Sequence, residues 1–159
     1  MRSTTSRIKS EIKQKKPFRS RQQEAAIAIL RTADVVRRRL ARVIEIRGIT
    51  LQQYNVLRIV GGAGSEGIPT LEIAGRMIEQ TPGITRLLDR LEARKLVRRE
   101  RCPSDRRQVL CWLTGQGRAL LKELEGPVDR ADHDAIGGLE SAAVDRLIGL
   151  LDGVRGEVG

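Results

Sequence analysis

The sequence predicts a mainly α-helical fold that includes one small β-hairpin. Apolar residues recur at spacings of three and four over several segments, which is the periodicity of amphipathic helices. Residues 96–113 instead contain two short runs of strand-forming residues on either side of a polar turn. The chain has 159 residues, of which 40% are hydrophobic and 2% aromatic, so its core must be aliphatic. This length suits one domain with an added helical layer.

The first long helix is predicted over residues 21–47. Ser20 and Gln23 have the spacing of a capping box, and Gly48 marks the end of the helix. Its apolar stripe contains Ala26, Leu30, Ala33, Leu40 and Ile44. A helix of this length extends about 40 Å, which is more than the small domain that follows can cover. Part of its apolar face is therefore expected to meet a partner chain.

A second helix is predicted to begin after Thr50, which repeats the capping-box spacing with Gln53. Ile49 and Tyr54 stand at the positions of a hydrophobic staple, a contact that sets the angle at which the chain enters the helix. Tyr54 is also the candidate for contact with a small ligand, although the staple is the favoured interpretation. The glycine-rich residues 61–67 lack the lysine and spacing of a phosphate-binding loop, so we interpret them as a connector.

Two further helices are predicted close together. Thr70 is expected to cap a short helix that ends at Met77, and its inward residues are predicted to be Leu71, Ala74 and Met77. A longer helix is predicted over residues 82–96, with Thr81 as its N-cap and Pro82 at its first position. Its apolar face contains Ile84, Leu87, Leu88 and Leu91. Its opposite, exposed face contains Pro82, Thr85, Arg86, Asp89 and Arg90.

Two strands follow, at residues 96–102 and 108–113. The turn residues between them are Pro103, Ser104 and Asp105. Arg106 and Arg107 then lie at or near the tip of the hairpin. Two short helices joined by a tight turn, the second with a basic outer face, are what helix-turn-helix recognition of DNA requires. A hairpin with a basic tip after them predicts the winged variant of this fold.

The C-terminal third predicts two more helices. Thr114 is expected to cap the first of them, and Gly126 and Pro127 are expected to bend or break it. The final helix is predicted over residues 140–153, with an apolar face made by Val144, Leu147, Ile148 and Leu151. We expect this helix to pair with the long first helix and build a homodimer.

These predictions divide the chain into three regions. Residues 1–19 are expected to form a flexible basic tail, residues 48–114 a winged helix-turn-helix DNA-binding region, and residues 20–47 with 115–159 a helical dimerisation region. The simpler interpretation of the tail is that it is inert, and the alternative is an additional arm that contacts phosphate.

Positive charge is concentrated in two parts of the chain, whose net charge is +10. Residues 1–19 contain seven basic and one acidic residue, and residues 81–114 contain nine and four. Residues 115–159 are acidic, with five basic and nine acidic residues. Such asymmetry points to a polyanionic partner that contacts part of the surface.

Several classes of protein and site are disfavoured by the sequence. No apolar run approaches the ~20 residues that span a bilayer, and no secretory signal is recognisable, so no membrane partner and a cytoplasmic location are expected. Cys102 and Cys111 are interpreted as packed side chains, with oxidation sensing as the alternative because Arg101 could lower the pKa of Cys102. His133 stands alone, so no metal and no other cofactor are expected. Carboxylates fall mostly on the polar faces of helices, so an enzyme is not expected.

Residues 97–117, VRRERCPSDRRQVLCWLTGQG, resemble the wing signature D-x-R-x5-L-T-x2-G of the MarR (multiple antibiotic resistance regulator) family. The matching residues are Asp105, Arg107, Leu113, Thr114 and Gly117. The preceding segment TPGITRLLDRLEARKLVRR resembles the recognition helix of that family, and the helix order extends the resemblance to residues 20–152. Two departures are Arg94 and Lys95 in place of the usual glycine before the wing, and Ala142 and Ala143 in place of an acidic residue at the start of the last helix.

The resemblance implies a homodimer in which the first and last helices of the two subunits intertwine. It implies that the recognition helix enters the major groove of double-stranded DNA and that the wing reaches the minor groove. Arg107 would then be the wing arginine and Asp105 the residue that orients it. Many relatives repress genes and release DNA when a small ligand binds, so a repressor with a palindromic operator and a small-molecule effector are expected.

The candidate DNA-binding residues of the helix are Gln80, Thr81, Thr85, Arg86 and Arg90, and those of the wing are Asp105, Arg106 and Arg107. Arg86 and Arg90 can reach guanine, with phosphate contact as the alternative. Thr81 and Thr85 are expected to contact phosphate or a thymine methyl group. Asp89 repels phosphate, so we expect it to hold Arg86 or another neighbouring arginine.

Two other functions remain open beside sequence-specific regulation. A winged-helix adaptor that binds proteins would not need basic residues on both the recognition helix and the wing. A non-specific architectural DNA-binding protein would need them, and sequence selectivity alone separates it from a regulator.

Overall fold

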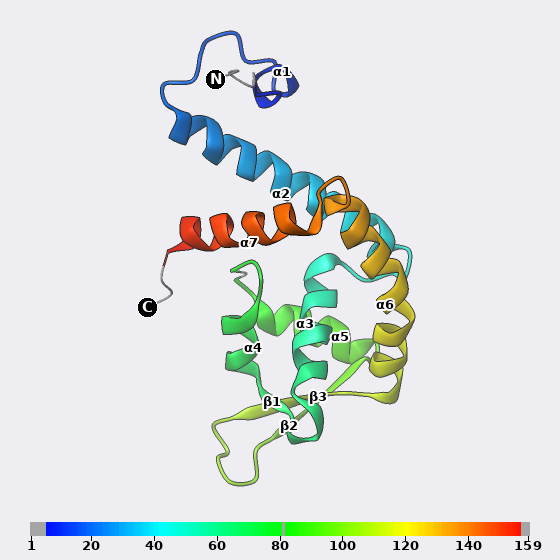
Figure 1. Cartoon of the computed structure of the whole chain (residues 1–159). Coiled ribbons are helices and arrows are strands. Elements are labelled where there is room, and N and C mark those ends of the chain that lie inside the picture. Colours follow the sequence, from blue (N-terminus) through cyan, green and yellow to red (C-terminus); the bar gives the residue numbers. More distant parts are fainter. Residues whose placement is uncertain (1–5, 81, 157–159) are drawn as a thin grey trace. The chain divides into compact units, whose positions relative to one another are not determined.

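The chain is mostly helical, and the computed structural model describes residues 6–80 and 82–156 (Figure 1). It divides into two units, residues 1–39 and 40–159. The first unit contains α1 (Ile8–Glu11) and most of α2 (Arg21–Glu45), which continues into the second unit. The short helix α1 lies within the predicted tail, where no helix was expected, and residues 1–5 of that tail lie outside the described residues.

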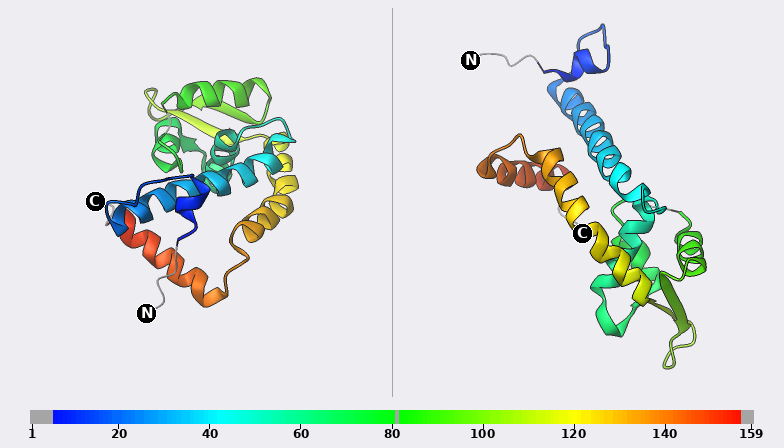
Figure 2. Two further views of the ribbon diagram at one scale, coloured as in Figure 1. Left: turned by 90° about the horizontal axis from the view of Figure 1, so that it is seen from above. Right: turned by 90° about the vertical axis from the view of Figure 1, so that its right-hand side faces the viewer.

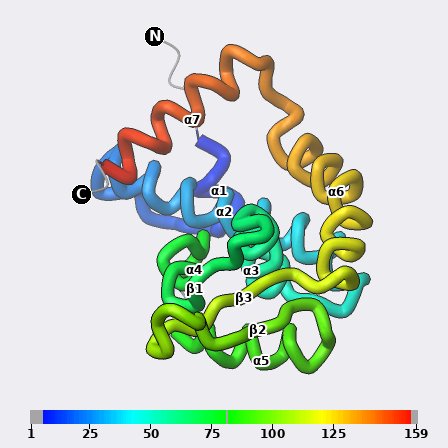
Figure 3. The backbone as a smooth tube through the Cα atoms, turned by 90° about the horizontal axis from the view of Figure 1, so that it is seen from below, coloured from blue at the N-terminus to red at the C-terminus, as the bar shows by residue number. Residues whose placement is uncertain are grey.

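The second unit contains the winged helix-turn-helix and the two C-terminal helices. In chain order its elements after α2 are α3 (Leu51–Gly62), the 3-10 helix η1 (Gly64–Glu66), β1 (Ile68–Pro69), α4 (Thr70–Arg76), α5 (Ile84–Ala93), β2 (Val97–Arg101), β3 (Val109–Leu113), α6 (Gly115–Ile136) and α7 (Ser141–Arg155). The predicted fold class is confirmed. In Figure 3, β2 lies between β3 and α5, and Figure 2 shows α6 leading away from the sheet toward α7.

The described residues form one antiparallel sheet with the strand order β1-β3-β2. The predicted hairpin is β2–β3, in which Arg99 lies opposite Cys111. The strand β1 was not predicted because it has only two residues, Ile68 and Pro69, which become a strand by pairing with Cys111 and Leu110. Proline is tolerated there because β1 is an edge strand.

An aliphatic core joins these elements within the second unit. Its fully buried side chains come from the end of α2, from α3 to α6 and from the sheet, and include Ile44, Leu57, Ile68, Ile73, Leu88, Leu91, Val97, Cys111 and Leu124. Burying one such aliphatic side chain stabilises the fold by about 1.5–3 kcal/mol. The predicted inward face of α5, which contains Leu87, Leu88 and Leu91, is confirmed.

Two helix starts were predicted from capping boxes. At α3 both bonds are present: the Gln53 N–H donates to Thr50 Oγ1 at 3.2 Å, and the Thr50 N–H donates to Gln53 Oε1 at 2.9 Å. At α2 the Gln23 N–H donates to Ser20 Oγ at 3.0 Å, but Gln23 Oε1 accepts from the Arg19 N–H at 2.8 Å instead of the Ser20 N–H. The first box is therefore confirmed, and the second is half formed.

The start of α4 differs from the prediction by one residue. Pro69 occupies the N-cap position and makes no side-chain cap, and Thr70 is already helical. The inward orientation predicted for Leu71 is wrong, since its side chain is 84% exposed while Ile73 is fully buried. One residue turns a helix by about 100°, so the tertiary contacts of Ile73 decide which face packs.

The start of α5 also differs. The helix begins at Ile84, and Gly83 occupies the N-cap position with φ +98°, a conformation that favours glycine. Pro82 therefore lies in the preceding turn and not at the first helical position. The predicted N-cap Thr81 lies outside the described residues.

The helix α6 begins as predicted, with the Gly117 N–H donating to Thr114 Oγ1 at 3.0 Å. The predicted break at Gly126 and Pro127 is wrong, because α6 continues to Ile136. A proline costs a helix one hydrogen bond, and buried Leu124 and Val128 pack on either side of this one. None of the residues of α7, all of them described, is buried. Among the described residues no helix is long and apolar enough to cross a membrane.

Candidate nucleic-acid interface

The helix α5 presents a polar, partly basic surface. Thr85, Arg86, Asp89 and Arg90 are exposed, while the leucines of the opposite face are buried. In the part of the chain that the structure describes, the guanidinium groups of Arg86 and Arg90 make no ion pair. Both are therefore available to an anionic partner, since no carboxylate has to be displaced first.

The connection between α4 and α5 is held by a buried asparagine of α3. Asn55 is 8% exposed, and its Oδ1 accepts from the Ile78 N–H at 3.0 Å. Met77 beside it is buried in the core, whereas the side chain of Ile78 is exposed. The predicted site residue Gln80 is exposed in this connection. Asn55 was missed in the sequence, although a polar residue among the apolar positions of α3 is a signal for such a bond.

A guanidinium from β2 connects the wing to α5. Arg99 Nη2 lies 2.6 Å from Asp89 Oδ1 and 2.6 Å from Glu92 Oε2, and the Arg99 Nε and N–H groups each donate to Glu92 at 3.1 Å. These hydrogen bonds, that to Glu92 first, raise the pKa of Arg99 above its usual value. The sequence predicted that Asp89 holds either Arg86 or another neighbouring arginine, and in the structure it pairs with Arg99. We call Arg99, Asp89 and Glu92 the wing clamp.

The tip of the wing is ordered by Asp105. Its Oδ1 accepts from the Arg107 N–H at 3.0 Å, and its carbonyl accepts from the Gln108 N–H at 2.9 Å. The Gln108 carbonyl in turn accepts from the Cys102 N–H at 2.9 Å, which closes the hairpin. Arg106 and Arg107 are exposed on the loop that extends beyond the sheet in Figure 1. Asp105 thus sets the backbone from which the Arg107 side chain extends.

The base of the wing is joined closely to the start of α6. Thr114 Oγ1 donates to the Lys95 carbonyl at 2.6 Å, and the Thr114 N–H donates to the Leu96 carbonyl at 3.1 Å. A Cβ atom on Gly117 would lie 2.1 Å from that Leu96 oxygen, so only glycine fits there. Two residues of the wing signature, Thr114 and Gly117, are therefore structural.

Lys95 takes the conformation that the missing glycine would have had. Its φ is +57°, and the helix end is completed by the Lys95 N–H to the Glu92 carbonyl at 2.8 Å and the Leu96 N–H to the Leu91 carbonyl at 3.0 Å. The side chain of Arg94 beside it donates to the carbonyl of Gly48. The end of α5 is thus well formed without the glycine.

The wing sheet is also fastened to the loop before β1. Trp112 Nε1 donates to the Ser65 carbonyl at 3.1 Å, and the Arg98 guanidinium lies 4.3 Å from the centroid of the Trp112 ring. Gly67 has φ +73°, and a Cβ atom there would lie 2.4 Å from the ring. The indole therefore leaves no room for a side chain at position 67, which explains why this position of the connector is a glycine.

The two cysteines have opposite environments. Cys111 is fully buried, and burial raises the pKa of its thiol to about 11. The pKa of Cys102 is lowered, chiefly by the Ser104 hydroxyl at 3.1 Å and then by the backbone of Asp105 and Ser104. The predicted influence of Arg101 on this pKa is not among the causes.

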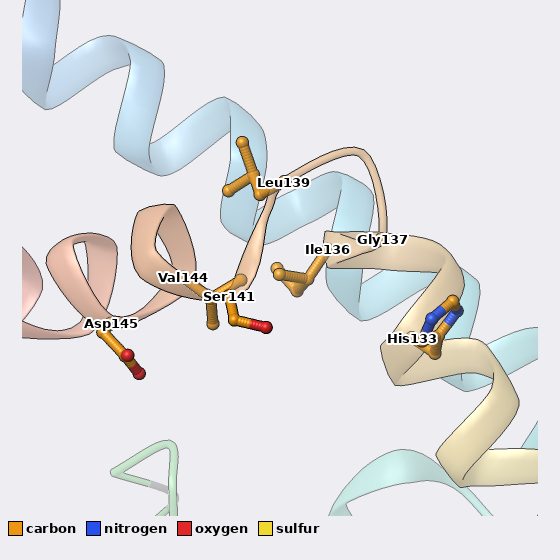
Figure 4. Close-up of a pocket in the computed structure, with 7 residues that line it drawn as sticks. All are labelled: His133, Ile136, Gly137, Leu139, Ser141, Val144 and Asp145. Atoms are coloured by element: carbon orange, nitrogen blue, oxygen red, sulfur yellow. The ribbon is translucent and has the colours of Figure 1, made fainter.

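Tyr54 and the staple residue Ile49 are both buried in the same core. Burial raises the pKa of its hydroxyl. A hollow lies elsewhere, at the bend from α6 to α7 (Figure 4), and is lined by His133, Ile136, Gly137, Leu139, Ser141, Val144 and Asp145. Tyr54 does not line that hollow, so its contact with a ligand stays a prediction. Among the described residues no group of three or more metal-binding side chains lies together.

The model of the MarR family matches residues 49–109, which run from the start of α3 to the start of β3. The chain is 32% identical to the transcriptional regulator HosA of Escherichia coli O111:H- over 95 residues, which cover 60% of this chain and 69% of HosA. The chain belongs to the MarR family. A match to the HTH-type transcriptional regulator TtmR of Methylorubrum extorquens (strain PA1) is 38% identical and covers 65% of this chain but 50% of TtmR.

Solved structures of MarR proteins share the fold. The MarR transcription factor from Planctomyces limnophilus has 39% identity and a TM-score of 0.66 over 85% of this chain and 98% of that one. A mutant MarR from E. coli, crystallised with operator DNA, has 25% identity and a TM-score of 0.77 over 87% and 99%. CouR from Rhodococcus jostii RHA1, bound to p-coumaroyl-CoA, has 25% identity and a TM-score of 0.74 over 89% and 99%. The chain thus has the winged helix-turn-helix fold of the MarR family of transcription regulators.

Proposed function

We propose that this MarR-family chain is a homodimeric repressor that binds a palindromic operator through α5 and the wing. The observation that carries the proposal is a pair of exposed basic surfaces on one unit, Arg86 and Arg90 on α5 and Arg106 and Arg107 at the wing tip. Arginine suits both grooves, because its planar guanidinium pairs with guanine in the major groove and is attracted into a narrow minor groove.

Each predicted site residue has a role in this proposal. Arg86 and Arg90 contact base edges, while Gln80, Thr81 and Thr85 contact phosphate or a thymine methyl group. Arg107 enters the minor groove, Arg106 contacts the backbone, and Asp105 holds the tip. Residues 48–114 form the DNA-binding region in this proposal.

The dimer is supported by the apolar surface of α7. Ile148 of the predicted apolar face is 53% exposed, and Leu150 and Val154, elsewhere on the same helix, are 70% and 67% exposed. Large apolar surfaces that stay exposed on a single chain mark sites of association. We propose that a second copy covers this face and that residues 20–47 and 115–159 form the dimerisation region.

A small-molecule effector completes the proposal, and CouR bound to p-coumaroyl-CoA is the relative that supports it. Tyr54 is the candidate contact. The protein acts in the cytoplasm and needs neither a cofactor nor a catalytic group for this function. A non-specific architectural role and a protein-binding adaptor role are the alternatives that the first experiment separates.

The first experiment is selection of purified protein on a random double-stranded DNA library at ~0.15 M salt, which screens loose contacts. The expected product is an imperfect palindrome whose half-sites lie about one helical turn, ~34 Å, apart. Binding that enriches no sequence and disappears as salt rises would indicate the architectural role. Absence of DNA binding at low salt would indicate the adaptor role.

Two arginine substitutions then test the roles within the site. Arg86→Ala is expected to cost about 1–3 kcal/mol on the selected operator and to change the preferred base at one position. Arg107→Ala is expected to weaken binding to all DNA sequences alike. Arg130→Ala, an exposed arginine of α6, is the control and should leave both properties unchanged. If each of the two site variants lowers the affinity for every DNA sequence by the same factor, the assignment of Arg86 to a base is wrong.

A further inference from the structure

The N-terminal segment carries a high density of positive charge that the winged helix-turn-helix does not use. Described residues 6–19 contain six basic side chains and one acidic one. The basic residues are Arg7, Lys9, Lys13, Lys15, Lys16 and Arg19, and all but the half-buried Lys9 are exposed.

These cations are not neutralised within the chain. Among the residues that the structure describes, none of the six makes an ion pair. The next helix differs, because Arg21 pairs with Glu24 at 2.6 Å and Arg38 with Asp34 at 2.9 Å. The charge of the N-terminal segment is therefore directed at a partner or at solvent and not at carboxylates of its own unit.

The segment has local structure that limits the entropy it would lose on binding. After α1, the Gln14 N–H donates to the Lys9 carbonyl at 3.0 Å and the Lys13 N–H to the Ser10 carbonyl at 3.1 Å. Lys13 has φ +54°, so these bonds form the left-handed turn that commonly ends a helix. The basic side chains thus stand on a short ordered turn and on the irregular residues that lead to α2.

We propose that residues 6–19 are a DNA-contacting arm that binds backbone phosphates of the duplex that α5 and the wing bind. The inference rests on the proposed function, because a chain bound to an operator keeps this arm tethered to a duplex that carries a dense row of phosphates. A tethered second contact acts at a high effective concentration, so even weak ion pairs add to affinity. A membrane surface fits less well, because an interfacial helix needs a long apolar face and α1 has four residues.

The test compares salt dependence in two matched triple variants. The arm variant is Lys15→Gln, Lys16→Gln and Arg19→Gln, and the control is Lys122→Gln, Arg130→Gln and Arg146→Gln, exposed polar positions of α6 and α7 that are not part of the apolar face proposed for the dimer. All six side chains are exposed, and both variants lose the same net charge. Affinity for the selected operator and for a scrambled duplex is measured by fluorescence anisotropy at salt concentrations on either side of ~0.15 M, where counterion release sets the slope.

The arm variant is expected to have a shallower dependence of log K on log salt, by about 0.9 for each phosphate that the arm no longer neutralises. Its affinity should fall about equally on operator and scrambled DNA, so that the ratio between them is unchanged. The control should match the wild-type chain in slope. Equal slopes for arm variant and wild type would overturn the inference, as would an equal reduction of slope in the control, which would indicate bulk charge.

The two proposals fail in different ways. A wild-type chain that selects an operator, together with an arm variant of unchanged slope, rejects the arm alone. A wild-type chain that selects no operator rejects the proposed repressor, and the slopes on scrambled DNA still decide whether the arm contacts phosphate.

Discussion

The winged helix-turn-helix and the last helix, α7, have similar apolar patterns but differ in how deeply those patterns are buried. In α5, Leu88 and Leu91 are 1% and 0% exposed, because α3, α4 and the sheet cover them. In α7, the predicted face is only partly covered: Ile148 is 53% exposed, and no residue of that helix is buried. The comparison shows that periodicity identifies an apolar face but not the element that covers it. The face of α5 is covered by its own chain, and we propose that a second chain covers that of α7.

The largest effect is expected from a charged substitution in the apolar face of α7. Ile148→Asp places a carboxylate on the surface that we propose the second copy covers, which is costly because a buried charge loses its hydration. The dimer dissociation constant should rise at least about 100-fold, corresponding to about 2.7 kcal/mol. Sedimentation velocity across a range of concentrations measures this change. Asp145→Ala, on the polar side of α7, is the control, and a wild-type chain that sediments as a monomer would contradict the comparison.

The second effect concerns the covered face of α5. Leu88→Ala leaves a cavity in the core and should lower the free energy of unfolding by about 2–5 kcal/mol. Because contacts within one chain form this site, the change should be the same at different protein concentrations. Urea unfolding at two concentrations measures it. Thr85→Ala, exposed on the same helix, should change stability by less than about 0.5 kcal/mol. A destabilisation in Leu88→Ala that grows with dilution would place Leu88 in the association instead.

A smaller effect is expected from the wing clamp. Arg99→Gln leaves the Asp89 and Glu92 carboxylates uncompensated beside the proposed phosphate contacts, and it releases β2 from α5. Operator affinity should fall about tenfold, which is about 1.4 kcal/mol. Adding Asp89→Asn to that variant should restore part of the affinity, because one of the two repelling charges is gone. Anisotropy titrations measure all three proteins, and an undiminished affinity for Arg99→Gln would show that the clamp does not act on binding.

The smallest effect separates the two cysteines. At neutral pH iodoacetamide should label Cys102 and spare Cys111, because the thiolate is the reactive form and the pKa is lowered at Cys102 but raised to about 11 at Cys111. Mass spectrometry of the wild type and Cys102→Ser, with and without urea, assigns the labelled thiol. Labelling of folded Cys102→Ser would show that Cys111 is accessible.

The buried thiol of Cys111 predicts that the stability of the fold depends on pH. The pKa of Cys111 is raised from 9.0 to about 11 in the folded chain, so the folded state holds its proton more tightly. The contribution is complete below pH 9.0 and is lost as the pH rises toward about 11. With Cys111→Ala, the free energy of unfolding should decline less as the pH rises from 9.0 toward about 11. Urea unfolding at several pH values in that range measures the difference.

Much of the fold was predictable because its signals are local. The Thr50 capping box, the wing turn at Asp105 and the leucine face of α5 each depend on residues within one or two turns of one another. The candidate arginines were predictable for the same reason, since the buried face of α5 determines which residues are exposed. The predicted break at Pro127 was wrong because the hydrogen bond that a proline costs the helix is offset by the burial of neighbouring residues, which depends on contacts beyond the local sequence.

The sequence by itself determined most of the helices, the hairpin and the basic surfaces, because hydrogen bonding and periodicity act between residues near in the chain. Only the tertiary structure decided the two-residue strand β1, the bond from Asn55 to Ile78, and the clamp from Arg99 to Asp89 and Glu92. Each of these joins separate elements. Their partners are chosen by packing in three dimensions, where the aliphatic core brings the elements within hydrogen-bond distance.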